Sequence, residues 1–174
     1  KHQSLYLDEL EAFLVKINLF GFHFATLDIR QNSKIHDAVF KDVVNHYLNS
    51  GSSIFPSNYF ELSESEKLDV LSKVRGELNP GDFEDEITRS TLESVQAIKT
   101  IQENNGEFGA NRYIISNNES ALNVMETFAM IRLNNWENPT VDIIPLFESV
   151  DDLQNAHEIM EQLYTNPEYS KHLQ

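Results

Sequence analysis

Residues 141–149 read VDIIPLFES, an almost unbroken apolar run that ends in a carboxylate and a serine. Near-continuous apolar strands are typical of parallel sheets that are buried on both faces. A helical pattern follows at 151–164, for which Ser149 is a suitable N-cap, with Asp151 and Asp152 in the first turn. This stretch therefore predicts a parallel strand that leads directly into a helix.

Two other segments repeat the order of strand and then helix. Residues 22–30 alternate between two faces, which predicts a strand with Asp28 beside Arg30 on one face. Residues 112–116, RYIIS, are a short β-branched run, and a helical pattern follows at 119–133. We expect a predominantly α-helical α/β fold in which helices flank three parallel strands.

The rest of the chain has helical patterns. Ser4 is a suitable N-cap for a first helix at 5–18, whose apolar residues on one face are Leu7, Leu10, Leu14 and Ile17. A second helix carries Ile35, Val39, Val43 and Tyr47 and ends at 50–53, the capping-box pair Ser63 and Glu66 opens a third, and a longer one covers 84–103. Residues 50–110 therefore form a mainly helical segment.

Length and composition indicate the class of protein. The 174 residues are 40% hydrophobic, which suits one domain or a piece of a larger one. The net charge of −15 opposes binding to nucleic acids and to anionic membranes. There is no cysteine, no signal peptide and no long apolar run, so we expect a cytoplasmic protein. The chain starts at Lys1 without a methionine, and we expect an excerpt of a longer protein.

Two charged residues stand at the ends of predicted strands. Arg30 ends the first strand and Glu148 follows the last one. In βα-barrel enzymes, side chains at the carboxyl ends of the strands line the active site. We therefore expect Arg30, Ser116 and Glu148 to lie at the same edge of the sheet, although three strands cannot close a barrel of eight.

These residues also have plainer interpretations. Taken alone, Arg30 would more often be an ion-pair partner of Asp28, and Glu148 a carboxylate that favours a helix N-terminus. Ser116 and Asn117 suit a capping or loop role, since no base is positioned to activate the serine. His157 is followed by Glu158 but lacks the second histidine of a zinc-protease helix, so a zinc site is rejected.

Three motifs carry a family resemblance. Residues 21–31 (GFHFATLDIRQ), 113–116 (YIIS) and 145–153 (PLFESVDDL) resemble, in order and spacing, the middle of bacterial-type phosphoenolpyruvate carboxylase. Ser33 and His36 continue the pattern, whereas Asn32 stands where the family often has an acidic residue. The resemblance implies one fragment, residues 1–174, of a (β/α) barrel domain with a helical insertion at about 50–110.

The resemblance also implies a reaction. Phosphoenolpyruvate carboxylases use bicarbonate and Mg²⁺ or Mn²⁺ to make oxaloacetate and phosphate, a carbon-fixing reaction that feeds the tricarboxylic acid cycle, through carboxyphosphate and an enolate. By resemblance, Arg30 is a catalytic residue that binds the substrate phosphate, and Glu148 is a metal ligand. A guanidinium suits phosphate oxygens, and a carboxylate suits a hard cation. The intact enzyme is expected to be a homo-oligomer, by resemblance a tetramer.

Other catalytic segments of the family are absent from this sequence. It has no His-Pro-Thr segment for the catalytic histidine, no Gly-Tyr-Ser-Asp-Ser segment for the second carboxylate ligand, and no glycine-rich basic loop. We expect the chain to be inactive by itself. The alternative is a non-catalytic helical module for interaction or regulation, in which the strand-end charges are structural.

Overall fold

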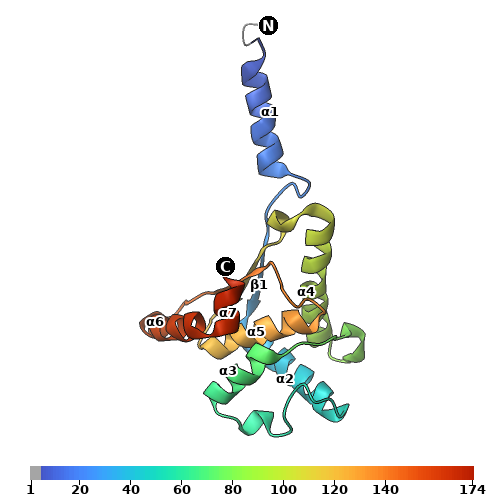
Figure 1. Cartoon of the computed structure of the whole chain (residues 1–174), viewed down its shortest axis with the longest axis vertical. Coiled ribbons are helices and arrows are strands. Elements are labelled where there is room, and N and C mark those ends of the chain that lie inside the picture. Colours follow the sequence, from blue (N-terminus) through green and yellow to red (C-terminus); the bar gives the residue numbers. More distant parts are fainter. Residues whose placement is uncertain (1–4) are drawn as a thin grey trace.

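The computed structural model describes residues 5–174, in which each strand leads into a helix (Figure 1). The strands are β1 (Asp28–Asn32), β2 (Arg112–Ser116) and β3 (Asp142–Pro145). The helices are α1 (Leu7–Phe20), α2 (Ser33–Asn49), α3 (Glu64–Lys73), α4 (Glu86–Asn105), α5 (Ala121–Leu133), α6 (Val150–Thr165) and α7 (Pro167–His172). Single 3₁₀ turns lie at Tyr59–Glu61, Pro80–Asp82 and Glu107–Gly109.

The three strands form one parallel sheet in the order β1-β2-β3. The register pairs Arg30 with Ile114 and Asn32 with Ser116, and Ile114 with Ile144. The predicted α/β class, with three parallel strands and flanking helices, is therefore confirmed. Because all strands run the same way, the loops that leave their carboxyl ends meet at one edge of the sheet.

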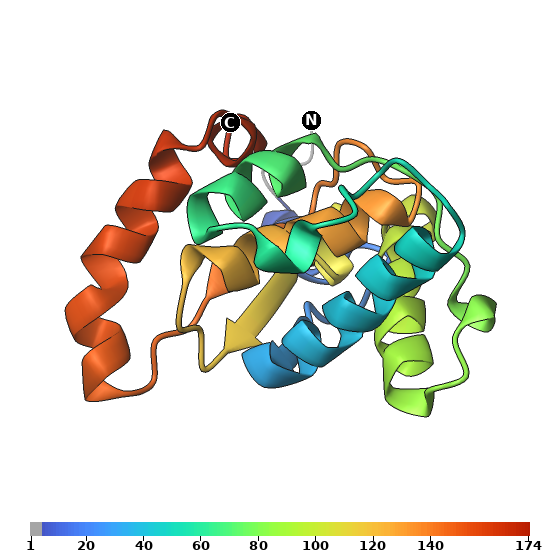
Figure 2. The same cartoon turned by 90° about the horizontal axis from the view of Figure 1, so that it is seen from below.

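Helix α5 is the centre of the core. All of its residues except Leu122 are buried, and it contacts β3 and the helices α2, α3, α4 and α6. A helix that is buried around its whole circumference has neighbours on every side. Figure 2 shows this arrangement from below, with α6 on one side of α5 and with α2 and α4 on the other.

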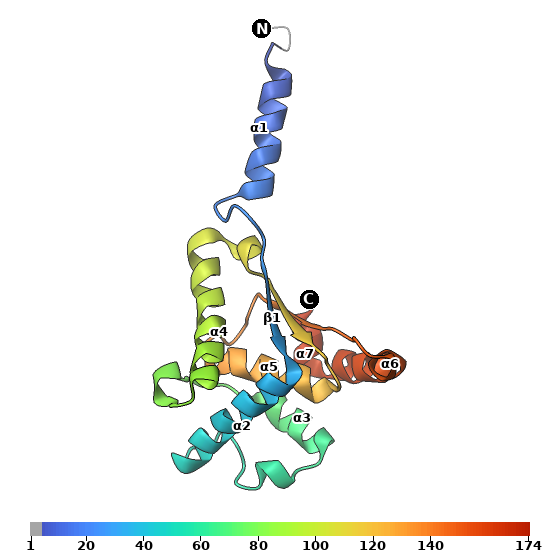
Figure 3. The same cartoon turned by 180° about the vertical axis from the view of Figure 1, so that it is seen from behind.

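Helix α1 stands away from the other elements (Figures 1 and 3). None of its residues, Leu7–Phe20, is buried by the described part of the chain, so its predicted apolar face is exposed to solvent. The helix ends at Phe20, two residues later than predicted, with Gly21 as its C-cap, and it starts after Tyr6; the predicted cap, Ser4, lies outside the described residues. No helix in residues 5–174 combines the length and apolarity needed to cross a membrane.

The first strand starts later than the sequence predicts, and it ends at Asn32 rather than at Arg30. Residues 22–27 are irregular rather than extended, and Phe24 has a positive φ of 64°. The reason is the lack of a partner, because β2 begins only at Arg112, opposite Asp28. Without a neighbouring strand the alternating pattern of residues 22–27 has nothing to pair with, and Phe22 is 92% exposed.

The helix starts predicted at Ser63 and at Ser149 are correct. Ser63 forms a reciprocal capping box with Glu66 at α3, and Ser149 forms one with Asp152 at α6. A third box, between Ser120 and Asn123, starts α5 and was not predicted. The caps of α5 and α6 satisfy backbone N–H groups at the loops that follow β2 and β3, and so fix the edge where the candidate site lies.

Candidate functional site

The carboxyl edge of the sheet brings together the three residues predicted to share it. Arg30 lies on β1, Ser116 ends β2, and Glu148 lies in the loop between β3 and α6. Backbone pairing continues past the end of β3, because the N–H of Leu146 donates to the carbonyl of Ile115 at 2.9 Å. The loop that carries Glu148 is thus held against β2.

The side chains of Arg30 and Glu148 are in direct contact. Arg30 Nη2 donates to Glu148 Oε1 at 2.7 Å. The second oxygen, Oε2, accepts a hydrogen bond from the backbone N–H of Asn117 at 2.8 Å. Each oxygen of the carboxylate therefore has one N–H donor, one from β1 and one from the end of β2.

The backbone around Asn117 is held from both sides. Asn117 has a positive φ of 54°, and its carbonyl accepts a hydrogen bond from Ser33 Oγ at 2.6 Å. The N–H of Asn118 donates to the carbonyl of Leu146 at 3.1 Å. Residues that follow all three strands are thus linked by hydrogen bonds at this edge of the sheet.

The alternative ion pair between Arg30 and Asp28 is not formed. Asp28 Oδ1 lies 2.7 Å from Arg112 Nε, at the opposite edge, where β1 and β2 begin. Arg112 lies on the neighbouring strand β2, directly opposite Asp28 in the register. Asp28 is therefore paired with Arg112, and Arg30 contacts Glu148 instead.

The contact between Arg30 and Glu148 is exposed and easily exchanged. Their side chains are 54% and 41% exposed, and a pair of this kind contributes about 0.2–1 kcal/mol. A guanidinium binds phosphate or carboxylate oxygens, and a carboxylate binds hard cations. An anionic ligand and a cation that arrive together could therefore replace this ion pair at little cost.

The residues present fit one ligand of a divalent cation and not a complete site. Glu148 offers carboxylate oxygens, which Mg²⁺ and Mn²⁺ prefer. Within residues 5–174, however, no three His, Asp or Glu side chains come together as a cluster that could hold a metal ion. Further ligands would have to be water, substrate or residues from outside the described part of the chain.

Behind the site, His36 is a structural residue. It is completely buried; its Nε2 lies 2.8 Å from the Tyr113 hydroxyl, and its Nδ1 lies 2.8 Å from Thr127 Oγ1. Burial lowers the pKa of His36 to about 4, so the ring is neutral near pH 7. The ring joins α2, β2 and α5 and thereby fixes the start of α2 close to Arg30.

A second polar cluster lines a cavity of about 400 Å³ between α2, α3 and α5. A side-chain hydrogen bond joins Asp37 to Glu126, and Asn123 Nδ2 donates to Asp37 Oδ1 at 2.9 Å. Burial, together with the charge of Asp37, raises the pKa of Glu126 to about 8. The Glu126 carboxyl therefore keeps its proton near neutral pH and donates a hydrogen bond to Asp37.

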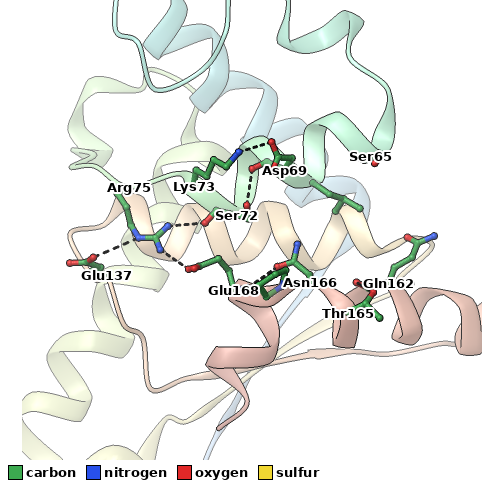
Figure 4. Close-up of a pocket in the computed structure, with 12 residues that line it drawn as sticks. Ser65, Asp69, Ser72, Lys73, Arg75, Glu137, Gln162, Thr165, Asn166 and Glu168 are labelled. Atoms are coloured by element: carbon green, nitrogen blue, oxygen red, sulfur yellow. Dashed lines mark hydrogen bonds and ion pairs between the residues drawn. The ribbon is translucent and has the colours of Figure 1, made fainter.

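A cavity of about 810 Å³ lies elsewhere, between α3 and the corner of α6 and α7 (Figure 4). Its charged groups are mutually paired. Glu168 Oε2 accepts from Arg75 and from Arg132, each at 2.8 Å, and Lys73 Nζ lies 2.6 Å from Asp69 Oδ2. These ion pairs connect α7 to α5 and to the segment that follows α3, and we assign them a structural role.

Comparison with known proteins identifies the family. The family model described as phosphoenolpyruvate carboxylase matches residues 1–174. The chain belongs to the phosphoenolpyruvate carboxylase family.

Individual phosphoenolpyruvate carboxylases give the same result. The chain is 33% identical over 180 residues to the enzyme of a Synechococcus species, a match that covers 98% of this chain and 17% of the relative. It is 33% identical over 165 residues to that of Nitrosomonas europaea, covering 88% and 17%, and 32% identical over 177 residues to that of Thermosynechococcus vestitus, covering 96% and 17%. The chain thus spans about 17% of the length of these phosphoenolpyruvate carboxylases.

Sequence reasoning found the two charged residues of this phosphoenolpyruvate carboxylase segment but missed what holds them. Asn117 was assigned a loop role, and Ser33 was noted only as part of the family pattern. A signal for Asn117 was present, because asparagine is enriched at positive φ and follows the last residue of a strand here. The link from Ser33 to Asn117 spans 84 residues and has no local signal.

Proposed function

We propose that this chain provides part of the active site of a phosphoenolpyruvate carboxylase, which joins phosphoenolpyruvate to bicarbonate to give oxaloacetate and phosphate. The proposal is supported by family membership and by one geometric observation, the contact of Arg30 with Glu148 at the carboxyl edge of a parallel sheet. That edge is where α/β enzymes of the barrel type bind their substrates. We interpret the sheet as part of such a barrel, in which residues 50–110 are an insertion.

In this proposal Arg30 binds the phosphate of phosphoenolpyruvate. Its guanidinium carries a permanent charge and presents two N–H groups in the spacing of two phosphate oxygens. Half of the side chain is exposed, so an anion can reach it. Binding the phosphate would orient the substrate and offset charge that accumulates on the phosphate as it leaves.

Glu148 has the complementary task. Its carboxylate would be one ligand of Mg²⁺ or Mn²⁺, with the remaining ligands supplied by water, substrate and other segments of the enzyme. The bound cation supplies a positive charge that stabilises an oxyanion. Glu148 immediately precedes the N-cap residue of α6, and its Oε2 accepts the Asn117 N–H, so the carboxylate is held at the end of this loop.

Activity in the whole protein requires more than these two residues. The family motifs for the catalytic histidine and the second carboxylate ligand do not occur among the 174 residues. We therefore propose that the chain alone does not catalyse the reaction. Likewise, the homo-oligomeric state, a cytoplasmic location and a place in carbon fixation are properties proposed for the whole enzyme.

The direct test is an assay of the full-length protein that carries this chain. With Mn²⁺, bicarbonate and phosphoenolpyruvate, we expect formation of oxaloacetate, read by coupling to malate dehydrogenase, and its loss on addition of a chelator. No oxaloacetate from a folded full-length protein would overturn the proposal. The alternative, a non-catalytic interaction module, would be favoured if the coding sequence on either side lacked the His-Pro-Thr and Gly-Tyr-Ser-Asp motifs.

A further inference from the structure

The backbone turn at Asn117 holds the Glu148 carboxylate, because the Asn117 N–H donates to Glu148 Oε2. We infer that Ser33, acting through the backbone of Asn117, positions the Glu148 carboxylate for the reaction. Neither residue would touch the substrate, so both are positioning residues. The inference rests on the proposed function, because it takes Glu148 to be a metal ligand.

The N–H of Asn117 contacts Glu148 directly, and the conformation of Asn117 places it there. The hydrogen-bond ladder between β1 and β2 ends with the pair Asn32 and Ser116, and the next residue adopts the left-handed conformation with a φ of 54°. This conformation ends the extended course of β2, and the Asn117 N–H bonds Glu148 Oε2 at 2.8 Å. A side chain other than glycine, asparagine or aspartate would disfavour this turn.

The next peptide group along the chain is also fixed by hydrogen bonds. The group that joins Asn117 to Asn118 is held at both ends, since its carbonyl accepts from Ser33 Oγ at 2.6 Å and its N–H donates to Leu146 at 3.1 Å. Ser33 therefore restrains the backbone just beyond the N–H that holds Glu148. Without this hydroxyl the carbonyl would lose its partner in a partly buried place, and the turn would loosen.

Ser33 does not cap the helix to which it belongs. A serine at the start of a helix usually caps that helix, but the cap of α2 is Asn32, whose side chain accepts from the N–H of Lys34 at 3.0 Å. Ser33 is 2% exposed and directs its hydroxyl to a residue 84 positions away. The hydroxyl thus serves the site rather than the helix to which Ser33 belongs.

This arrangement has a consequence for substrate binding. Arg30 holds Oε1 of Glu148, and Asn117 holds Oε2. When Arg30 turns to a phosphate group, the Asn117 N–H keeps one oxygen of the carboxylate in place, and the other oxygen becomes available to a cation. A backbone donor suits this task because it carries no net charge and does not compete for the phosphate.

The test compares Ser33→Ala with Ser72→Ala. Ser72 is also a buried serine that donates to a backbone carbonyl, that of Asp69 at 2.7 Å, but it lies on α3 away from the site. Amide hydrogen exchange in this chain, measured by NMR, should be about fivefold faster at Asn117 and Asn118 in Ser33→Ala, the effect of one lost hydrogen bond. Ser72→Ala should leave both rates unchanged.

Two substitutions of Asn117 test the backbone conformation of the same turn. Asn117→Val should speed exchange at Asn118 more than Asn117→Gly does, because a β-branched residue disfavours a positive φ and glycine accepts it. The melting temperature of each variant verifies that the chain is folded. Exchange in Ser33→Ala within twofold of the unsubstituted chain would overturn the inference.

The role toward the reaction is measured separately in the full-length protein. The dissociation constant of Mn²⁺ alone, measured by electron paramagnetic resonance, should rise several-fold in Ser33→Ala and more in Glu148→Gln. If Glu148→Gln weakens Mn²⁺ binding but Ser33→Ala does not, the positioning inference is overturned and the ligand assignment stands. If neither weakens it, the ligand assignment of Glu148 fails as well.

Discussion

The guanidinium of Arg30 lies 2.7 Å from the carboxylate of Glu148, although 118 positions separate the two residues in the chain. Parallel strands bring them together, because Arg30 lies two residues before the end of β1 and Glu148 lies three residues beyond the end of β3. The pair is exposed, so each group can exchange the other for a ligand of opposite charge. A phosphate and a divalent cation are the two ligands that this pair of groups would take.

Arg30→Lys should impair the use of phosphoenolpyruvate in the full-length protein. Lysine keeps one positive charge but loses the planar pair of donors, so we expect the KM for phosphoenolpyruvate to rise roughly tenfold. A fall in kcat would indicate that the contact tightens in the transition state. The measurement is a steady-state titration with phosphoenolpyruvate at saturating Mn²⁺ and bicarbonate.

Arg112→Lys is the matched control for that experiment. Arg112 is also a strand arginine in an ion pair of 2.7 Å, with a similar exposure of 44%, but it lies at the opposite edge of the sheet. Its substitution should leave the KM for phosphoenolpyruvate near that of the unsubstituted protein. Equal effects of both substitutions would contradict a specific role for Arg30.

The isolated chain should not make oxaloacetate. The segments that resemble the family's catalytic histidine and second metal ligand are missing from its sequence, so we expect no turnover with phosphoenolpyruvate, bicarbonate and Mn²⁺. The assay is the coupled oxidation of NADH by malate dehydrogenase, with the full-length protein as the positive control. Turnover that a chelator abolishes would show that these 174 residues hold a complete active site.

Stability should depend on pH through Glu126. Its pKa is raised to about 8 in the fold, above the value of about 4.3 expected for an unfolded chain. Between these values the folded state holds a proton that the unfolded state has lost, so stability falls as pH rises from about 4.5 to 8. Glu126→Gln imitates the protonated carboxyl and should remove this dependence.

The measurement is the melting temperature of this chain from pH 5 to pH 8. We expect the advantage of Glu126→Gln over the unsubstituted chain to grow by on the order of 5 °C across this range. The control is Glu93→Gln, which alters an exposed carboxylate on α4. An advantage that stays constant with pH would mean that Glu126 is ionised in the fold.

Glu168→Gln should loosen the attachment of α7. Glu168 Oε2 accepts hydrogen bonds from Arg75 and from Arg132, and the Arg132 side chain is only 4% exposed. Loss of the carboxylate charge leaves a buried guanidinium without its counter-ion, at a cost of about 2 kcal/mol and a fall of about 4–8 °C in melting temperature. Glu137→Gln, whose side chain is 75% exposed and 4.0 Å from Arg75, should change the melting temperature by less than half as much.

Local sequence patterns predicted most of the fold correctly. The capping box of Ser63 and Glu66 and the cap at Ser149 act within one helical turn, so their signals lie in adjacent residues. The strand at 22–30 was wrong at its start, because an alternating pattern becomes a strand only beside a partner, and β2 offers none before Arg112. Helix α7 is a single short segment that begins at Pro167, and it has too few residues for a periodic pattern.

The candidate site could be predicted in part. The proximity of Arg30 and Glu148 could be predicted from their positions near the carboxyl ends of parallel strands. The hydrogen bonds of Asn117 and Ser33 depend on a backbone angle and on a contact across 84 positions, and neither has a local pattern. The same is true of the shared proton between Asp37 and Glu126, which lie on two different helices.

The most direct test of the central claim is the metal response of Glu148→Gln in the full-length protein. Glutamine keeps the size and the hydrogen-bonding oxygen of glutamate but removes the charge that a hard cation requires. The matched control is Asp28→Asn, because Asp28 forms an equally short ion pair at the other edge of the sheet. We expect the Mn²⁺ concentration for half-maximal activity to rise at least about tenfold in Glu148→Gln, with an unchanged melting temperature, and to stay the same in Asp28→Asn. A normal metal response in Glu148→Gln would show that this carboxylate is structural and that the proposed site is wrong.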